Sequence, residues 1–297
     1  MRYSCLPLLL LSVTPSVSCT DATPPARRAP ADCLADPGCT QVLIAAHRGY
    51  HAVEPENSLA ALRAAATLGA DLVEVDVRDT ADGELVLMHD AEIDRTTDGT
   101  GLVGELTWAE LQARRLVLGD PSNPESYSIP RFVDALALAD ELGLALYVDQ
   151  KTDATDLVLS AVQGGPYQHL ALIRDDLAPL VPMAAADPTL LVMPAVTSVE
   201  ELQAARAAIP GLRWVELSAA RADAALNQQA AALGVRVQQD VIASGDALAA
   251  FGDYTGYWAF IEAGVGILQA EYPQLLIPAE RTWERTGRFP LSGPGIL

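Results

Sequence analysis

Three carboxylates in the first half of the chain are placed to share one cation. Glu74 and Asp76 are two residues apart in the apolar segment 72–77, so on a strand their side chains would point to the same side. Two carboxylates that face one space repel each other unless a proton or a cation lies between them. Asp149, at the end of the neighbouring predicted strand, would add a third oxygen ligand. Three carboxylates with open coordination positions suit a hard divalent ion such as Mg²⁺ or Ca²⁺.

Two of the four histidines also follow predicted strands. His47 ends the first strand and His89 ends a hairpin after the second, which strengthens the metal interpretation of the carboxylates nearby. Imidazole both accepts and donates protons near neutral pH, so the pair is predicted to supply a general acid and a general base. Which histidine takes which role is left open. His51 and His169 are predicted to be structural residues, with contact to the substrate as the alternative for His51.

Two cations next to these groups could hold an anion such as a phosphate. Arg48 would bind it through a planar fork and Lys151 as a point charge. Gly49 would allow a tight turn that brings the backbone near the anion. The alternative for Arg48 is a plain salt bridge to one of the carboxylates.

Eight buried strands separated by helices would position these residues. From residue 41 onward, short apolar runs alternate with Ala- and Leu-rich helical stretches, and Asp82-Gly83 predicts a tight hairpin turn. This alternation predicts a closed α/β TIM (β/α)8 barrel, with its active site at the carboxyl ends of the strands. A small insertion is predicted after the second strand, at about 91–129. The predicted strands are 42–46, 72–77, 144–148, 170–173, 190–193, 213–217, 235–238 and 265–268.

One domain accounts for the length of the chain. Its 297 residues, 50% of them hydrophobic, fit a single barrel at 41–278, followed by a poorly ordered or surface-bound tail at 279–297. The net charge of -20 argues against nucleic acid and against charge-driven binding to an anionic membrane. No protein partner is predicted. The predicted helices are 58–68 with Asn57 as its N-cap, 108–114, 132–142, 199–208 and 223–233.

The N-terminal residues 1–18 have the pattern of a secretory signal peptide. Arg2 precedes an apolar run at 6–13, which is shorter than the roughly 20 residues of a bilayer-spanning helix. Cys19 follows small residues and resembles the lipid-modified cysteine of bacterial lipoproteins. We therefore expect an exported periplasmic or cell-surface lipoprotein, anchored to the membrane through Cys19. A cleaved, secreted form is the alternative.

A Pro-rich tether is predicted at 19–40. If Cys5 leaves with the signal peptide and Cys19 carries lipid, Cys33 and Cys39 are the remaining pair. An isolated pair at short spacing in an exported protein predicts a disulfide that closes a small loop, with two free thiols as the alternative.

A series of longer motifs runs in one order through most of residues 43–151. In this order they strongly resemble the glycerophosphodiester phosphodiesterase family. The motifs are His47-Arg48-Gly49, Pro55-Glu56-Asn57-Ser58-Leu59, Glu74-Val75-Asp76, Met88-His89-Asp90, Arg95-Thr96-Thr97-Asp98-Gly99, Ile129-Pro130 and Asp149-x-Lys151.

The resemblance implies a TIM barrel and a metal-dependent phosphoric diester hydrolase. Its substrate would be a small glycerophosphodiester, and its products glycerol 3-phosphate and an alcohol. The implied site residues are the metal ligands Glu74, Asp76 and Asp149, the acid–base pair His47 and His89, and the phosphate-binding Arg48 and Lys151.

The chain departs from the family pattern at several positions. The third metal ligand is usually Glu in the family, whereas here it is Asp149. The family's Thr-Asp before Tyr-Pro is here Ala270-Glu271, and its Trp-Thr-Val-Asn element is replaced by the sequence at 238–241. Glu216 and Gln239 end strands and could line the pocket or have structural roles. The preferred head group is therefore left open.

Two other functions remain as alternatives. A phospholipase D-like enzyme of the sphingomyelinase D type, which shares this barrel, would cleave intact lipids and form cyclic phosphates. A barrel that binds phosphodiesters without turnover is the second alternative. The attacking group in the hydrolytic reaction, water or the substrate's own glycerol hydroxyl, is not decided by the sequence.

Overall fold

The computed structural model describes residues 26–217 and 223–296, and the predicted (β/α)8 barrel is confirmed. Eight strands of the described sheet are parallel, and β3 is antiparallel to β2. The strands are β1 Leu43–Ala46, β2 Leu72–Asp79, β3 Leu85–Leu87, β4 Ala145–Gln150, β5 Ala171–Asp175, β6 Leu191–Val196, β7 Trp214–Leu217, β8 Arg236–Asp240 and β9 Ile267–Ala270.

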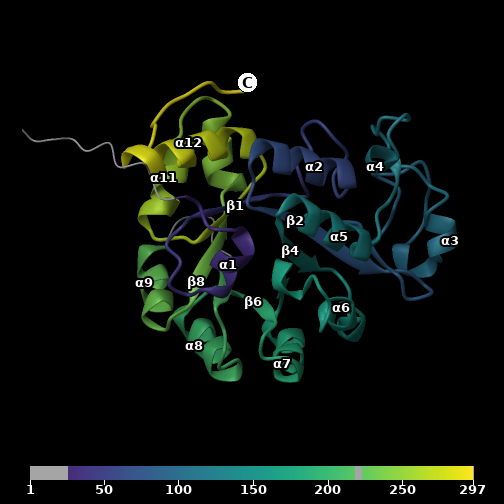
Figure 1. Cartoon of the computed structure of the whole chain (residues 1–297), viewed down its shortest axis with the longest axis horizontal. Coiled ribbons are helices and arrows are strands. Elements are labelled where there is room, and N and C mark those ends of the chain that lie inside the picture. The colour runs from purple at the N-terminus through teal and green to yellow at the C-terminus, as the bar shows by residue number, and fades with distance from the viewer. Residues whose placement is uncertain (1–25, 218–222, 297) are drawn as a thin grey trace, which may run out of the picture.

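The barrel closes because β1 pairs with both β2 and β9. Helices surround the strands, while α3 and α4 extend to one side (Figure 1). The α-helices are α1 Pro30–Ala35, α2 Leu59–Leu68, α3 Trp108–Leu111, α4 Pro124–Tyr127, α5 Phe132–Leu142, α6 Thr155–Val162, α7 Leu177–Ala186, α8 Val199–Ala208, α9 Ala224–Ala232, α10 Ala247–Ala249, α11 Thr255–Glu262 and α12 Pro273–Thr286. Short helical turns lie at Val103–Glu105, Gln168–Leu170 and Ile242–Asp246.

Strand residues alternate between two apolar layers. Leu43 and Ala45 belong to the cluster inside the barrel, whereas Ile44 and Ala46 belong to the layer between strands and helices. Because both faces are buried, the strands read as continuous apolar runs in the sequence. Their register places Asp76 of β2 directly opposite Asp149 of β4. Burial therefore fixes which polar side chains reach the carboxyl end of the barrel.

Helix α1 closes the amino end of the barrel, where the sequence predicted only a tether (Figure 1). Its Leu34 is fully buried in the inner cluster, and its carbonyl accepts a hydrogen bond from Trp214 Nε1 at 2.9 Å. Arg236 stacks on the Trp214 ring at 4.4 Å and donates to the Gln41 carbonyl. The tether prediction is therefore wrong for this segment, because its apolar residues fill the open end of the barrel.

A disulfide joins Cys33 of α1 to Cys39, with the two Cα atoms 5.3 Å apart. We expect the double variant Cys33→Ala/Cys39→Ala to be about 2 kcal/mol less stable, because a short loop is no longer closed in the unfolded chain. Urea denaturation of the variant and of the oxidised wild type measures the difference, and reduced wild-type protein is the matched control. Identical denaturation midpoints for all three would contradict the expectation.

The C-terminal helix α12 overturns the predicted end of the barrel at residue 278. It continues through Pro278 to Thr286, so the expected tail at 279–297 begins only at Gly287. Proline removes one helical hydrogen bond. Two contacts outweigh that loss: α12 buries an apolar face against the barrel, and its fully buried Glu280 pairs with Arg27 at 3.2 Å.

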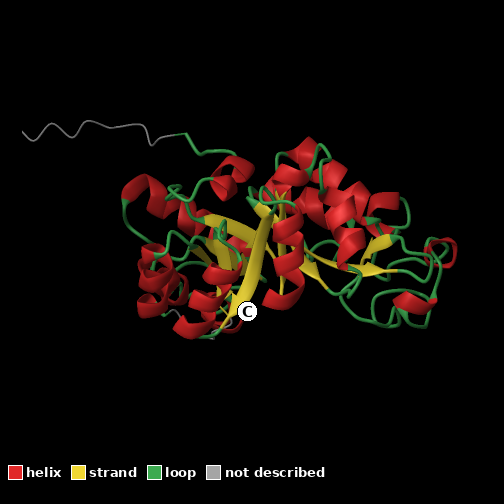
Figure 2. Cartoon of the chain, turned by 90° about the horizontal axis from the view of Figure 1, so that it is seen from below, coloured by secondary structure: helices red, strands yellow, loops and turns green. Residues whose placement is uncertain are grey.

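The predicted insertion lies between β3 and α5 and has an apolar core of its own. Figure 2 shows it as a lobe beside the barrel. The predicted helix 108–114 ends at Leu111, and a capping box between Thr107 and Glu110 fixes its start. The core residues of the insertion are Val86, Met88, Ile93, Val103, Leu111, Leu116 and Ile129.

Two further expectations concern chain ends and helix caps. The predicted signal peptide at 1–18 and the lipidated Cys19 lie outside the described residues. Across residues 26–217 and 223–296, no helix combines the length and the apolar character needed to cross a bilayer. The N-cap of α2 is Ser58, whose Oγ accepts from Ala61 N at 3.0 Å, and not Asn57 as predicted.

Candidate active site

The predicted carboxylates gather at the carboxyl ends of β2 and β4. Glu74, Asp76 and Asp149, which together form what we call the carboxylate group, each offer one oxygen. These oxygens all lie within 4.8 Å of one another. Glu74 is 2% exposed and Asp76 is 1% exposed. Burial, followed by repulsion from Asp76 and Asp149, raises the pKa of Glu74 well above its usual value. This donor set of two buried and one partly buried carboxylates, which repel one another, fits a hard divalent ion that would remove the repulsion.

Asn57 fixes one of these carboxylates, a role that the sequence did not reveal. Its side-chain amide donates to Asp76 Oδ2 at 2.8 Å, and its Oδ1 accepts from Asp76 N at 3.1 Å. Asn57 has a positive φ of 56°, which asparagine tolerates better than most residues. The Pro-Glu-Asn-Ser motif therefore supplies the outer support of the carboxylate group.

The two predicted phosphate-binding cations contact these carboxylates. The Arg48 guanidinium is 3.1 Å from Glu56 Oε1 and 3.5 Å from Asp76 Oδ2, so the salt-bridge alternative describes its contacts here. Lys151 Nζ contacts Asp149 and is 3.6 Å from Asp76 Oδ1. Burial alone would lower the pKa of Lys151, but Asp149 raises it above its usual value. Both side chains are therefore cationic at the edge of the carboxylate group.

Gly49 has a packing role that differs from the one predicted. Its φ is 84°, and a Cβ at this position would lie 2.7 Å from the Ala61 Cβ of α2. The close approach of α2 to the turn after β1 therefore requires glycine here. The same turn directs the Arg48 backbone N–H at Glu74 Oε2, 2.8 Å away.

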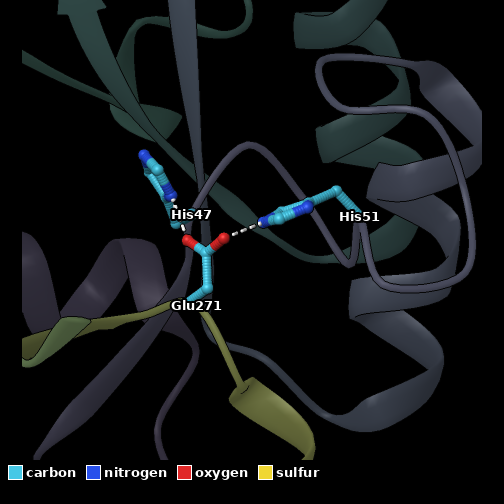
Figure 3. Close-up of side chains that lie close together, drawn as sticks. All are labelled: His47, His51 and Glu271. Atoms are coloured by element: carbon cyan, nitrogen blue, oxygen red, sulfur yellow. Dashed lines mark hydrogen bonds and ion pairs between the residues drawn. The ribbon is translucent and has the colours of Figure 1, made fainter. Parts of the chain in front are cut away.

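His47 lies between the carboxylate group and Glu271. Its Nδ1 is 2.7 Å from Glu271 Oε2, and its Nε2 is 4.0 Å from Glu74 Oε2 (Figure 3). The hydrogen bond with His47 and then the close contact with His51 lower the pKa of Glu271, which is therefore ionised and only accepts. The proton of a neutral His47 thus lies on Nδ1, and Nε2 is available as a base facing the carboxylates.

His89 has the same arrangement in the loop after β3. Its Nδ1 is 2.7 Å from Asp90 Oδ1. Hydrogen bonds from Arg95 and then from His89 lower the pKa of Asp90 to about 2, so this carboxylate also orients the imidazole in one tautomer. Arg95 makes two hydrogen bonds of 2.7 Å to Glu56, the residue that also binds Arg48. Ion pairs therefore connect both predicted catalytic loops.

Of the remaining polar residues at the strand ends, some are linked to the carboxylate group and others lie far from it. Glu216 is 8% exposed; it pairs with Arg174 and accepts from the Tyr147 hydroxyl at 3.1 Å. Arg174 also reaches Asp149 Oδ1 at 3.3 Å. His169 precedes β5 at the opposite, amino end of the barrel, as expected for a residue outside the site.

Arg78 links the loops of His89 and Lys151. It donates to the His89 carbonyl through Nη2 at 2.8 Å and to the Lys151 carbonyl through Nη1 at 3.0 Å. No motif in the sequence distinguished it from an ordinary strand-end arginine. Its contacts indicate a positioning role for one imidazole and one cation together.

We expect Arg78→Met to reduce kcat roughly 10–100-fold, because small displacements of a catalytic group have effects of this size. Steady-state kinetics and the free energy of unfolding should be measured together. Arg131→Met is the matched control, since Arg131 pairs with Asp134 on the exposed surface of α5. A loss of stability with unchanged kcat would show that Arg78 is structural only.

Comparison with known proteins gives one family. Residues 47–252 match the model of the "Glycerophosphoryl diester phosphodiesterase family". Glycerophosphodiester phosphodiesterase 1 of Bos taurus is 41% identical over 119 residues, which are 38% of this chain and 35% of that protein. The Homo sapiens protein of the same name is 54% identical over 67 residues, 23% of this chain and 20% of that protein. The chain thus spans about a third or less of the length of these curated relatives.

Solved structures share the fold over a larger part of the chain. A glycerophosphodiester phosphodiesterase from Agrobacterium tumefaciens superposes with a TM-score of 0.66 at 20% identity, covering 80% of this chain and 100% of that chain. An Oleispira antarctica phosphodiesterase, solved in complex with the product sn-glycerol-3-phosphate, has a TM-score of 0.66 at 22% identity. It covers 82% of this chain and 97% of that chain. At these identities the likeness establishes a common barrel.

Proposed function

The chain belongs to the glycerophosphoryl diester phosphodiesterase family, and from this membership we propose that it is a phosphoric diester hydrolase acting on glycerophosphodiesters. The products would be glycerol 3-phosphate and a free alcohol. The proposal rests on the position of His47. Its Nε2 lies 4.0 Å from Glu74, beside three carboxylates that fit a cation. A proton acceptor beside a cation-binding group suits attack on an anionic phosphodiester.

A divalent ion, Mg²⁺ or Ca²⁺, would be held by Glu74, Asp76 and Asp149. When bound, such an ion supplies positive charge that stabilises the phosphoryl oxygens in the transition state. Arg48 and Lys151 would add the phosphate contacts at the edge of the carboxylate group. With a net charge of -20, the protein needs these local cations to attract an anionic substrate.

The two imidazoles would carry the proton transfers. One accepts a proton from the attacking hydroxyl, and the other donates a proton to the oxygen of the departing alcohol. Glu271 and Asp90 support these roles because each binds the Nδ1 of its histidine and leaves Nε2 for the reaction. The attacking hydroxyl is that of water, or that of the substrate's own glycerol through a cyclic phosphate.

The test of the proposed function is product release by protein stripped of metal. Glycerol 3-phosphate should appear from glycerophosphocholine or glycerophosphoethanolamine only after Mg²⁺ or Ca²⁺ is restored. Phosphorus NMR of the same reaction separates the two routes, since a cyclic phosphate accumulates only when the glycerol hydroxyl attacks. Release of the head-group alcohol from lysophospholipid or sphingomyelin, with no release of alcohol from the water-soluble substrates, would overturn the proposal in favour of the phospholipase D-like reaction.

We propose that the protein acts after export as a lipoprotein. The Cys33–Cys39 disulfide supports this location, because disulfides persist in oxidising compartments. Fatty-acid labelling of the expressed full chain should modify wild-type protein and spare Cys19→Ser. Equal labelling of both proteins, or none, would contradict lipidation at Cys19.

A further inference from the structure

His47, His51 and Glu271 form a second group of metal-ligating side chains beside the carboxylates. The two histidines lie in the turn after β1, and Glu271 directly follows β9 (Figure 3). The Glu271 carboxylate bridges them: Oε2 is 2.7 Å from His47 Nδ1 and Oε1 is 3.0 Å from His51 Nε2. One ligand atom from each residue lies within 4.8 Å of the other two.

His51 is not satisfied by this arrangement. Its Nε2 is buried from solvent and forms no regular hydrogen bond, although Glu271 Oε1 lies 3.0 Å away as an ion-pair partner. A buried polar atom without a well-directed partner is costly unless another group binds it. A metal ion bound between His51 Nε2 and Glu271 would give this nitrogen a well-directed partner.

We propose that His47, His51 and Glu271 bind a transition-metal ion of the Zn²⁺ type, and that this ion inhibits the enzyme. The inhibitory part rests on the proposed phosphodiesterase function. Two imidazoles and one carboxylate are a donor set that suits Zn²⁺, with bonds of roughly 2.0–2.2 Å and one position left for water. The three ligand atoms need only small movements around a central ion to reach such bonds.

The two groups of ligands differ in the ions that they select. Glu74, Asp76 and Asp149 offer oxygen alone, which suits Mg²⁺ or Ca²⁺. The imidazole nitrogens of the second group favour zinc and related ions over these hard ions. His47 lies between the groups, with Nδ1 at Glu271 and Nε2 at Glu74. An ion at the second group therefore acts directly on a catalytic imidazole.

Zinc on Nδ1 would remove His47 from proton transfer. In the neutral imidazole, Nδ1 carries the proton, because its partner 2.7 Å away is the ionised Glu271 carboxylate, which only accepts. When the metal takes Nδ1, the single proton of neutral imidazole moves to Nε2, which can no longer accept one. To act as an acid, the zinc-bound His47 would have to lose its Nε2 proton and become an imidazolate anion. This is far less favourable than the loss of a proton from a metal-free imidazolium, which leaves neutral imidazole. Either catalytic role is blocked.

The surrounding charges favour a cation at this place. Glu271 is ionised, and its backbone N–H is bound by Asp246. Burial, followed by repulsion from Glu216, raises the pKa of the nearby Asp240, and His47 opposes that rise. The nearby cations are engaged elsewhere, Arg48 with Glu56 and Asp76 and Arg174 with Glu216 and Asp149. An incoming dication therefore meets an excess of negative charge.

The binding test uses the full chain, metal-free and then saturated with Mg²⁺ to fill the carboxylate group. Calorimetry with ZnCl₂ should give one site in wild-type protein, and Co²⁺ bound there should give a tetrahedral visible spectrum. His51→Gln should weaken zinc binding at least ~100-fold, since even outer-shell partners of a metal are worth about 10–100-fold in affinity. His169→Gln is the matched control, and its affinity should equal that of the wild type. Equal affinity in His51→Gln would overturn the site.

The activity test separates this inference from the proposed function. Zinc should inhibit wild-type turnover even in excess Mg²⁺, whereas His51→Gln should retain its turnover at the same zinc concentration. If excess Mg²⁺ relieved inhibition equally in both proteins, zinc would be acting at the carboxylates and the inhibitory role would be overturned. A protein without turnover on any substrate would refute the proposed function, while the calorimetric and Co²⁺ measurements would still decide the binding site.

Discussion

His89→Ala is expected to reduce the release of glycerol 3-phosphate at least ~10²-fold, which is the usual contribution of a positioned acid or base. The loss should fall on kcat, because the phosphate contacts proposed for Arg48 and Lys151 do not involve His89. His89 is one-third exposed in a loop, so its removal should leave the free energy of unfolding almost unchanged. Kinetics with saturating Mg²⁺ and urea denaturation measure the two effects.

Two further variants make this prediction specific. Asp90→Asn keeps the imidazole but removes the ionised carboxylate that binds Nδ1, so it should give a smaller loss than His89→Ala. His169→Ala removes a histidine at the opposite end of the barrel and should retain full turnover. If turnover survived in His89→Ala, the acid–base assignment would be wrong and the reaction would have to use another proton donor or acceptor.

Glu74→Gln is expected to abolish metal-supported turnover and to stabilise the metal-free protein. The amide retains the shape of the side chain but replaces one of the three proposed anionic ligands with a weaker, neutral oxygen, which should lower turnover by at least ~100-fold at limiting metal. In the absence of metal, the same change removes a buried charge that Asp76 and Asp149 repel. Loss of function and gain of stability should therefore occur in one variant.

The pH dependence of stability follows from the raised pKa of Glu74. Because its pKa in the folded, metal-free protein lies above the value of 4.5, the folded state binds a proton that the unfolded state has lost. The stability of metal-free wild type should thus fall as the pH rises from about 4.5 through the raised folded pKa. The stability of Glu74→Gln should lack this pH-dependent fall. Its advantage over the wild type should therefore be largest at the upper end of that pH range.

Denaturation of metal-free proteins at several pH values measures the effect. Glu262→Gln, an exposed change on α11, is the matched control and should follow the wild type. Adding Mg²⁺ or Ca²⁺ should stabilise the wild type by about 2.7 kcal/mol at a concentration 100 times its Kd, and Glu74→Gln far less. Equal pH profiles for wild type and Glu74→Gln would show that the carboxylates are not coupled as described.

The sequence predicted the barrel and one side of its site because both depend on local patterns. Buried strands are apolar runs, and the residues that follow them must lie at the carboxyl end. The Asp82-Gly83 turn was equally local: Gly83 has a φ of 84° and connects β2 to β3 as a hairpin. Glu74, Asp76 and Asp149 could thus be placed together from spacing and strand order before any contact was known.

Contacts between distant segments could not be predicted in this way. Glu271 departs from the family pattern, which the sequence reveals, but its contact with His47 joins residues 224 positions apart. Arg27 lies in the expected tether and reaches Glu280, 253 positions away, which helps to extend α12 beyond its predicted end. Such pairs depend on the closure of the barrel, which brings β1 and β9 side by side.

The sequence by itself determined the eight-stranded barrel, the order of its motifs and the residue types at the rim, because burial and strand periodicity act over a few residues. Only the tertiary structure decided that α1 closes the amino end, that Arg78 binds the loops of His89 and Lys151, and that Glu271 orients His47 and also contacts His51. In each case the sequence contains many polar side chains that could have formed the contact, and the packing of the folded chain selects one pair. They become defined when chain segments far apart in sequence come within 3 to 4 Å of one another.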